Sequence, residues 1–187
     1  MGINKENKKF LLELARKTII NRSKKIFLTE EEINNLSDKL KEKRGCFVTL
    51  TIKKNLRGCI GYILPVAPLY QSVIENAYNA AFTDPRFSPV RSEEIDKLNI
   101  EISVLTIPEK IQYCDKNDLL CKLNSYEDGL IIKKGFSSAT FLPQVWEQLP
   151  NKEEFLTHLC LKAGLCFNEW ESGSLEVEKY NVEAFEE

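Results

Sequence analysis

The sequence predicts an α+β protein, a two-layer sandwich of helices on mainly antiparallel sheets. Two helical segments come first, and strands and short helices then alternate along the chain. Predicted β-hairpins outnumber predicted crossover units, and hairpins join antiparallel strands whereas parallel strands need long crossovers. The 187 residues are enough for one good core, or for two lobes that share it.

The N-terminal segment is predicted to be helical. Apolar residues at helical spacing predict an amphipathic helix over Lys5–Asn21. A second helix opens at Thr29, where Glu32 stands at the third position of a capping box. Its buried face continues to Leu40, and Gly45 ends the helical region.

A β-hairpin and a closely packed helix follow. Cys46–Ile52 alternates as a strand, Lys53–Asn55 turns the chain, and Leu56–Leu64 returns it. Pro68 suits the first turn of the next helix, whose inner alanines predict close packing against the sheet. The proline-flanked loop Asp84–Pro89 stops that helix.

The rest of the chain reads as shorter elements. They are a short acidic helix capped by Ser92, a strand over Asn99–Ile107, a short helix within 115–126, a hairpin of 129–134 and 139–142 around Gly135, a helical turn from Pro143, a helix capped by Asn151 and a strand over Leu175–Tyr180.

Composition sets the class of protein and its compartment. The hydrophobic fraction of 43% and charged fraction of 29% are typical of a soluble globular protein, and the net charge of −2 argues against a dedicated nucleic-acid binder. No apolar run is long enough to cross a membrane, and the polar N-terminus lacks the apolar centre of a signal peptide, so we expect a cytoplasmic protein. The six cysteines have no paired spacing and are expected to be free thiols, mostly buried.

The run from Leu56 to Gly61 is the first candidate site. Strand alternation predicts that Arg57 and Cys59 share one face about 7 Å apart, with Leu56 and Ile60 on the other. A neighbouring cation favours the thiolate, which is the reactive form of cysteine. The glycines at 58 and 61 remove side-chain bulk, so another backbone or a ligand can come close. The alternative is that Cys59 is a small residue that only fills a tight space.

Asp84 and Arg86 form the second candidate site, in a loop that Pro85 stiffens. Arg86 could join Arg57 in holding a carboxylate or phosphate, with Asp84 as an acid/base or orienting group. The alternative is an internal ion pair or a helix-end cap. The single histidine, His158, lies on the flank of a helix and is expected to be an ordinary surface residue, so Cys–His catalysis has little support.

Metal and nucleotide motifs are absent from the sequence. It contains no Cys-x-x-Cys, no His-x-x-x-His, no Walker loop and no Gly-x-Gly-x-x-Gly, so we predict neither a metal site nor a cofactor. The lysine pairs at 24–25, 53–54 and 133–134 lie at a helix boundary or beside hairpin turns. They are most simply interpreted as solvated ends of these elements.

The motifs together resemble the AmmeMemoRadiSam system protein A family, whose domain is called AMMECR. Matching segments follow one another in order from about Gly45 to the end: Phe47–Leu50, Leu56–Gly61, Ala80–Ala81, Asp84–Phe87, Ser103–Thr106, Gly129–Ile132, Phe141–Val145 and Lys162–Leu165. Two departures, Thr83 and Trp146, leave the hallmark Leu56–Gly61 intact.

The resemblance implies one AMMECR domain over 1–187 with two α+β lobes and a cleft between them. We place the smaller lobe at roughly 45–92 and the larger lobe in the remainder. The family name implies a pathway or complex with a Memo-like protein and a radical-SAM protein. The hallmark segment is expected to lie at the cleft.

These observations lead to one hypothesis and two rivals. The first is that the protein binds or modifies a small anionic ligand. Its catalytic residues would be Cys59 and Asp84, and its ligand-binding residues would be Arg57, Gly58, Gly61 and Arg86. The second is a non-catalytic module that docks the Memo-like and radical-SAM proteins, favoured by the lack of a second acid/base group near the thiol. Nucleic-acid binding is the third and is unlikely at this net charge.

Overall fold

A computed structural model describes residues 2–24 and 28–187 and confirms the α+β fold with antiparallel sheets. Contacts divide the chain into two compact units. The first runs to Ile107 and takes in Glu183–Glu187, and the second comprises Pro108–Val182. Residues 45–92, the predicted smaller lobe, lie within the first unit, because the helix α1 (Lys5–Asn21) and the strand β3 (Asn99–Leu105) share a core with that segment.

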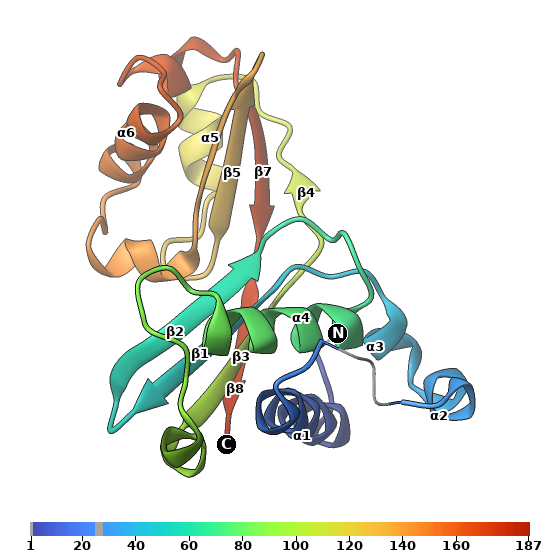
Figure 1. The fold of residues 1–187 in the computed structure, drawn as a ribbon. Coiled ribbons are helices and arrows are strands. Elements are labelled where there is room, and N and C mark those ends of the chain that lie inside the picture. The colour runs from blue at the N-terminus through green and yellow to red at the C-terminus, as the bar shows by residue number, and fades with distance from the viewer. Residues whose placement is uncertain (1, 25–27) are drawn as a thin grey trace. The chain divides into compact units, whose positions relative to one another are not determined.

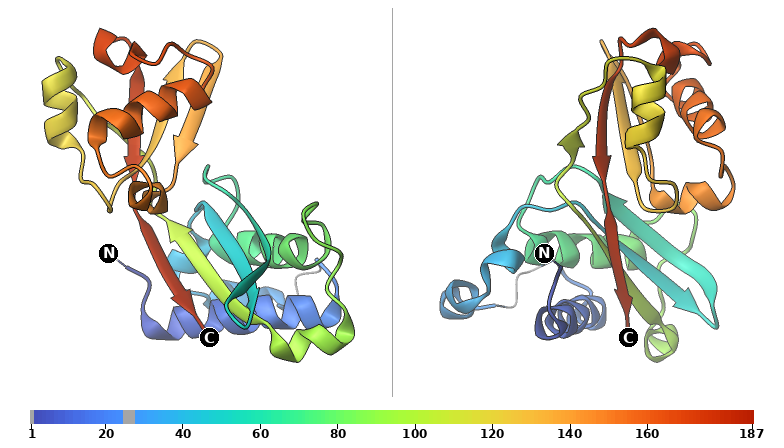
Figure 2. Two further views of the ribbon diagram at one scale, coloured as in Figure 1. Left: turned by 90° about the vertical axis from the view of Figure 1, so that its left-hand side faces the viewer. Right: turned by 180° about the vertical axis from the view of Figure 1, so that it is seen from behind.

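The first unit is a four-stranded sheet with helices on one face (Figures 1 and 2). Its strand order is β2-β1-β3-β8, and β1 pairs antiparallel with both β2 and β3. Its elements in chain order are α1 (Lys5–Asn21), α2 (Glu30–Asn35), α3 (Asp38–Lys41), β1 (Cys46–Ile52), β2 (Asn55–Tyr62), α4 (Leu69–Phe82), the 3₁₀ helix η1 (Ser92–Lys97), β3 (Asn99–Leu105) and β8 (Val182–Glu186).

The second unit has its own four-stranded sheet, in the order β4-β7-β5-β6. The pairs β4–β7, β5–β6 and β5–β7 are antiparallel. Its elements are β4 (Glu109–Lys110), α5 (Lys116–Lys122), β5 (Gly129–Lys134), β6 (Ser137–Phe141), η2 (Pro143–Glu147), α6 (Lys152–Lys162), η3 (Glu169–Ser172) and β7 (Glu176–Tyr180).

The predicted second helix is the main difference in secondary structure. Its capping box is present as expected: Thr29 accepts a hydrogen bond from the Glu32 backbone, and the Glu32 side chain accepts one from the Thr29 backbone. The helix then stops at Asn35, because Leu36 is extended, and a separate short helix, α3, follows Ser37. The prediction of one continuous helix is therefore wrong, because this segment forms two short helices.

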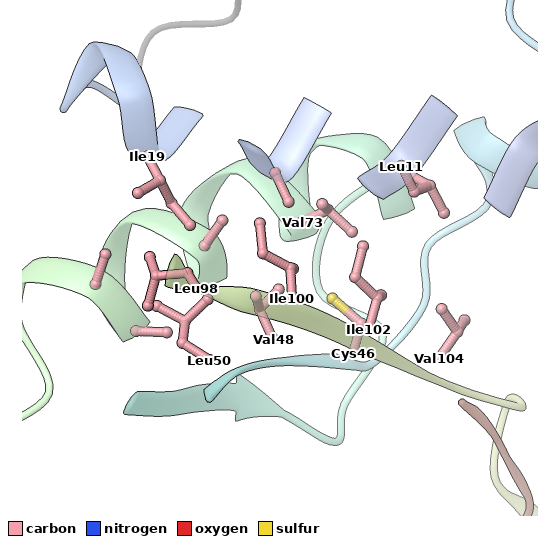
Figure 3. Close-up of a cluster of buried hydrophobic side chains, with 14 of the residues drawn as sticks. Leu11, Ile19, Cys46, Val48, Leu50, Val73, Leu98, Ile100, Ile102 and Val104 are labelled. Atoms are coloured by element: carbon pink, nitrogen blue, oxygen red, sulfur yellow. The ribbon is translucent and has the colours of Figure 1, made fainter. Parts of the chain in front are cut away.

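The core of the first unit lies between α1, α4 and the sheet (Figure 3). Alternate strand residues, Val48 and Leu50 on β1 and Ile100 and Ile102 on β3, point toward the helices and are fully buried. Small residues on α4, such as Ala77, let that helix pack closely on them. The residues between them, such as Thr49, therefore point to the opposite face of the sheet.

The core of the second unit surrounds a buried aromatic pair. The rings of Trp146 and Phe155 stack with centroids 3.7 Å apart and planes 10° apart. The Trp146 indole also donates a 2.7 Å hydrogen bond to the carbonyl of Asp128, so its only polar atom is satisfied. Each unit thus has a separate hydrophobic cluster.

The cysteines differ partly from expectation. All are free thiols, but Cys114, Cys121 and Cys166 are exposed rather than buried: Cys121 lies on the short helix α5, Cys114 just before it, and Cys166 in the segment between α6 and η3. Within the described residues, no helix is long and apolar enough to cross a membrane.

Candidate functional site

A β-bulge in β2 changes the geometry of the hallmark segment. Pairing with β1 runs Thr49↔Cys59 and Leu50↔Gly58, then shifts to Thr51↔Leu56 and leaves Arg57 without a partner. Bulges bend a strand and redirect side chains. Leu56 therefore shares a face with Thr51, and the predicted common face of Leu56 and Ile60 is wrong.

Arg57, the bulged residue, pairs with Glu94 of η1. Its Nε and one Nη donate to the two carboxylate oxygens of Glu94 at 2.8 and 3.0 Å. The Arg57 side chain is only 16% exposed, so this bidentate ion pair uses much of the hydrogen-bonding capacity of its guanidinium. The ion pair lowers the pKa of Glu94 from its usual 4.5 to about 2, and the backbone N–H of Arg91 contributes to that shift.

The first unit should lose stability in acid through this pair. A carboxyl whose pKa is lower in the folded state stabilises the fold above its unfolded pKa, and the benefit is lost as pH falls through the folded value. We expect the free energy of unfolding to fall between about pH 5 and about pH 2. Glu94→Gln should flatten that fall, whereas Glu93→Gln, a change at the exposed neighbour, should not. Urea unfolding at a series of pH values measures both slopes, and equal slopes in the two variants would contradict the assignment.

The space beside the two glycines of the hallmark is occupied by other parts of the chain. A Cβ on Gly58 would lie 2.1 Å from the carbonyl oxygen of Ala80 in the last turn of α4. A Cβ on Gly61 would lie 2.4 Å from the carbonyl oxygen of Cys46 and from the Phe47 ring. Of the two expected reasons for these glycines, close approach of another backbone is what the structure shows. The approach at Gly58 brings the end of α4 against β2.

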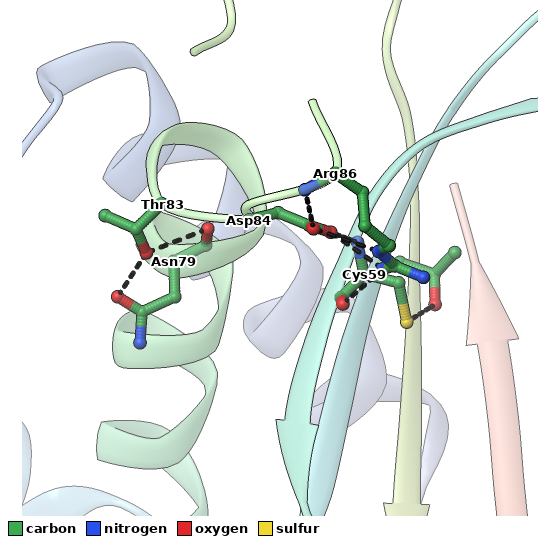
Figure 4. A network of polar contacts seen from close by, with 6 residues as sticks. Cys59, Asn79, Thr83, Asp84 and Arg86 are labelled. Carbon is green, nitrogen blue, oxygen red and sulfur yellow. Dashed lines mark hydrogen bonds and ion pairs between the residues drawn. The ribbon is translucent and has the colours of Figure 1, made fainter. Parts of the chain in front are cut away.

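Asp84 follows directly after that end of α4 and is bonded to Cys59 and Arg86 (Figure 4). The Cys59 backbone N–H donates to Asp84 Oδ2 at 2.9 Å. Arg86 donates from Nε to Oδ1 at 3.0 Å and from Nη2 to Oδ2 at 2.7 Å, and its backbone N–H donates to Oδ1 at 3.1 Å. The same Nη2 donates to the carbonyl of Cys59 at 2.9 Å.

The loop therefore caps the edge of the sheet at one residue. β2 is an edge strand, and both the N–H and the C=O of Cys59 are engaged by the loop: Asp84 accepts from the one and Arg86 donates to the other. In an antiparallel pair, a residue whose polar groups point outward lies close to its partner across the strand. That partner is Thr49, and its Oγ1 lies 3.2 Å from Cys59 Sγ.

The electrostatics of Asp84 favour an orienting role over proton transfer. The side chain of Asp84 is 1% exposed, and the Arg86 guanidinium is the main cause that holds the pKa of this carboxyl far below its usual range. A general acid or base works best with a pKa near the working pH. Asp84 is instead a fixed anion that aims Arg86, whose own pKa is raised chiefly by Asp84.

The structure brings together three of the predicted site residues, Cys59, Asp84 and Arg86, and pairs Arg57 with Glu94 instead. Thr49 was not predicted as a site residue, and only the register of the β1–β2 hairpin could have placed it beside Cys59. His158 is exposed on α6, as expected for a surface residue. In the part of the chain that the structure describes, no group of three or more His, Cys, Asp or Glu could hold a metal ion.

The fold and site define a two-unit α+β protein with a half-buried thiol at the edge of its first sheet. The family model for AMMECR1 matches residues 12–185. The chain belongs to the AMMECR1 family.

Two archaeal relatives and one solved structure are similar over most of their lengths. A protein of Methanothermobacter thermautotrophicus is 38% identical over an alignment of 192 positions that covers 99% of this chain and 96% of the relative. One of Methanocaldococcus jannaschii is 42% identical over 162 residues, covering 83% and 79%. The crystal structure of an uncharacterised Pyrococcus horikoshii protein has a TM-score of 0.80 and 39% identity, covering 99% of this chain and 93% of that one.

Proposed function

We propose that this protein binds a small anionic ligand beside Cys59, with Arg86 as the anion contact and the thiol as the contacting or reacting group. The observation that carries the proposal is the Arg86 guanidinium, which is fixed yet half-exposed: its side chain is 53% exposed while Asp84 is buried. Asp84 orients Arg86, and Gly58 lets the end of α4 come close enough for both side chains to bond the backbone of Cys59.

The guanidinium has capacity left for a ligand. Nε and Nη2 of Arg86 are occupied by Asp84 and Cys59, but within the described ranges its Nη1 has no hydrogen-bond partner. A fixed donor loses little conformational entropy when it binds an anion. Arg57 is a weaker candidate because Glu94 already occupies its fork.

Alkylation by a charged and a neutral reagent tests this proposal. Iodoacetate and iodoacetamide both form a thioether with the thiolate and release iodide, but only iodoacetate carries a negative charge. We expect the ratio of the iodoacetate rate to the iodoacetamide rate at Cys59 to exceed that at the exposed Cys166 by about 3-fold or more, since a fixed cation raises the local concentration of anions. Site-resolved mass spectrometry measures both rates in one sample.

Variants of Arg86 make the test specific. Arg86→Gln should bring the ratio at Cys59 down to that at Cys166, and Arg86→Lys should keep part of the preference because the charge remains. Arg91→Gln, which removes an exposed arginine on the same unit, should leave the ratio unchanged. An equal ratio of iodoacetate to iodoacetamide rates at Cys59 and Cys166 in the wild-type protein would contradict the proposed anion site.

A second candidate is a docking module for the Memo-like and radical-SAM proteins. An exposed apolar loop between β2 and α4 favours it: Leu64 and Val66 are 53% and 60% exposed. Backbone hydrogen bonds hold this loop, including Val66 N–H to Leu64 C=O at 2.9 Å and Arg44 N–H to Ala67 C=O at 3.3 Å. The alkylation experiment separates the two candidates, because a docking surface predicts no preference for iodoacetate at Cys59.

A further inference from the structure

We infer that Thr49 is a further positioning residue of the thiol site, whose hydroxyl holds the Cys59 thiolate by a hydrogen bond. This inference rests on the proposed function, in which Cys59 is the contacting or reacting group. It deepens that function by adding the residue that sets the direction and the reactivity of the sulfur.

The contact follows from the strand register. Thr49 and Cys59 are directly opposite in the antiparallel pair, and Oγ1 lies 3.2 Å from Sγ. Asp84 and Arg86 engage the outward backbone groups of Cys59, so the strand cannot slide or rotate freely at this point. The side chain opposite is therefore the neighbour that Sγ meets first on this face of the sheet.

The chemistry of the two groups gives the contact a direction. A hydroxyl has one donor and two acceptor sites, whereas a thiol is a weak donor and a thiolate a good acceptor. When Cys59 loses its proton, Thr49 can donate to the sulfur, and a hydrogen bond to a charged acceptor is stronger than one between neutral groups. Thr49 thus stabilises the thiolate more than the thiol, and the thiolate is the nucleophile.

The side chain of threonine suits this role. Branching at Cβ restricts χ1 to few rotamers, so the hydroxyl stays near the sulfur at little entropic cost. Thr49 lies on the sheet face opposite the buried Val48 and Leu50, where it is not needed to fill the core.

The rival explanation is that Thr49 is only a good strand former. Thr51 gives a matched control, because it lies on the same strand and the same face and is also half-buried. Among the described residues, its hydroxyl makes no hydrogen bond, and it pairs with Leu56 instead of a thiol. A difference between the two positions therefore reports the contact with sulfur and not the strand propensity.

The experiment compares Thr49→Val, Thr49→Ser and Thr51→Val in the whole protein. The rate of alkylation of each cysteine by iodoacetamide is followed by mass spectrometry from pH 5 to pH 10. We expect Thr49→Val to move the pH midpoint for Cys59 upward and to lower its rate at neutral pH by about 3- to 10-fold, as for the loss of one hydrogen bond to a charged group. Thr49→Ser should retain most of the wild-type rate, and Thr51→Val should match it.

Internal cysteines show whether each variant is folded. Cys46 and Cys160 are buried, and burial raises the pKa of the Cys46 thiol to about 12, so both should stay unreactive in a folded protein. If Thr49→Val made Cys46 reactive, the comparison would move to Thr49→Ser and Thr49→Ala, which fit in the same space. An unchanged midpoint and rate at Cys59 in a folded variant without the hydroxyl would overturn the inference.

The outcomes separate this inference from the proposed function. If wild-type Cys59 shows no preference for iodoacetate, the anion site fails whatever Thr49 does. If Cys59 keeps that preference and Thr49→Val reacts like the wild type, only the role of Thr49 fails.

Discussion

Replacing Gly58 with alanine is expected to lower the free energy of unfolding of the first unit by about 3 kcal/mol or more. The new Cβ would lie 2.1 Å from the carbonyl oxygen of Ala80 and 3.0 Å from its carbonyl carbon. Both are backbone atoms, so relief requires that α4 move away from the sheet. That movement would also pull Asp84 from the N–H of Cys59, so the rate of Cys59 alkylation should change with stability.

Urea unfolding followed by far-UV circular dichroism measures this effect. Fluorescence is a poor readout for the first unit, because both tryptophans, Trp146 and Trp170, lie in the second unit. Gly135→Ala is the control: Gly135 has a φ of +58° and no atom within 4 Å of an added Cβ, so only backbone strain of about 1 kcal/mol applies. A Gly58→Ala protein no less stable than Gly135→Ala would contradict the close contact with α4.

Asp84→Asn is expected to cost about 2 to 3 kcal/mol and to release Arg86. The amide keeps one oxygen acceptor but places an NH₂ group where Asp84 now accepts N–H donors from Cys59 and Arg86. The loss should be smaller than for a fully buried ion pair, because the Arg86 side chain is 53% exposed. Acid should weaken the folded state at Asp84 as it does at Glu94. The pKa of Asp84 is lowered by folding, so its contribution to the free energy of unfolding is present at neutral pH and is lost as pH falls.

Two measurements check this variant. Urea unfolding gives the loss of stability, and Asp96→Asn, a change at an exposed carboxylate close by in the chain, should stay within about 0.5 kcal/mol of the wild type. Alkylation gives the state of Arg86: once the guanidinium is no longer fixed, the preference of Cys59 for iodoacetate should change while Cys166 is unaffected. A fully stable Asp84→Asn protein would mean that the network in Figure 4 does not hold the loop.

Much of the fold could be predicted from local patterns. The helix over Lys5–Asn21 and the strand over Cys46–Ile52 were predicted at their observed bounds, because each has a clear period of apolar residues. β4 and β8 were missed for different reasons. β4 consists of two exposed charged residues. β8 is defined only by its pairing with β3, which is far away in the sequence.

The site could be predicted in its residues but not in its geometry. Cys59, Asp84 and Arg86 are recognisable as reactive or charged groups beside glycine and proline, and the structure joins them. The partner of Arg57 depends on a one-residue bulge, which strict alternation cannot reveal. Thr49 has no signal of its own, since threonine is common in strands and only the hairpin register places it against the sulfur.

The return of residues 183–187 to the first unit has a consequence for folding during synthesis. Residues 108–182, a whole unit with its own core, leave the ribosome before β8 can join β3. Until then, β3 presents an uncovered edge to other nascent chains, and uncovered edges promote aggregation. The first unit thus precedes residues 108–182 in the chain yet completes its sheet only after those residues have been synthesised.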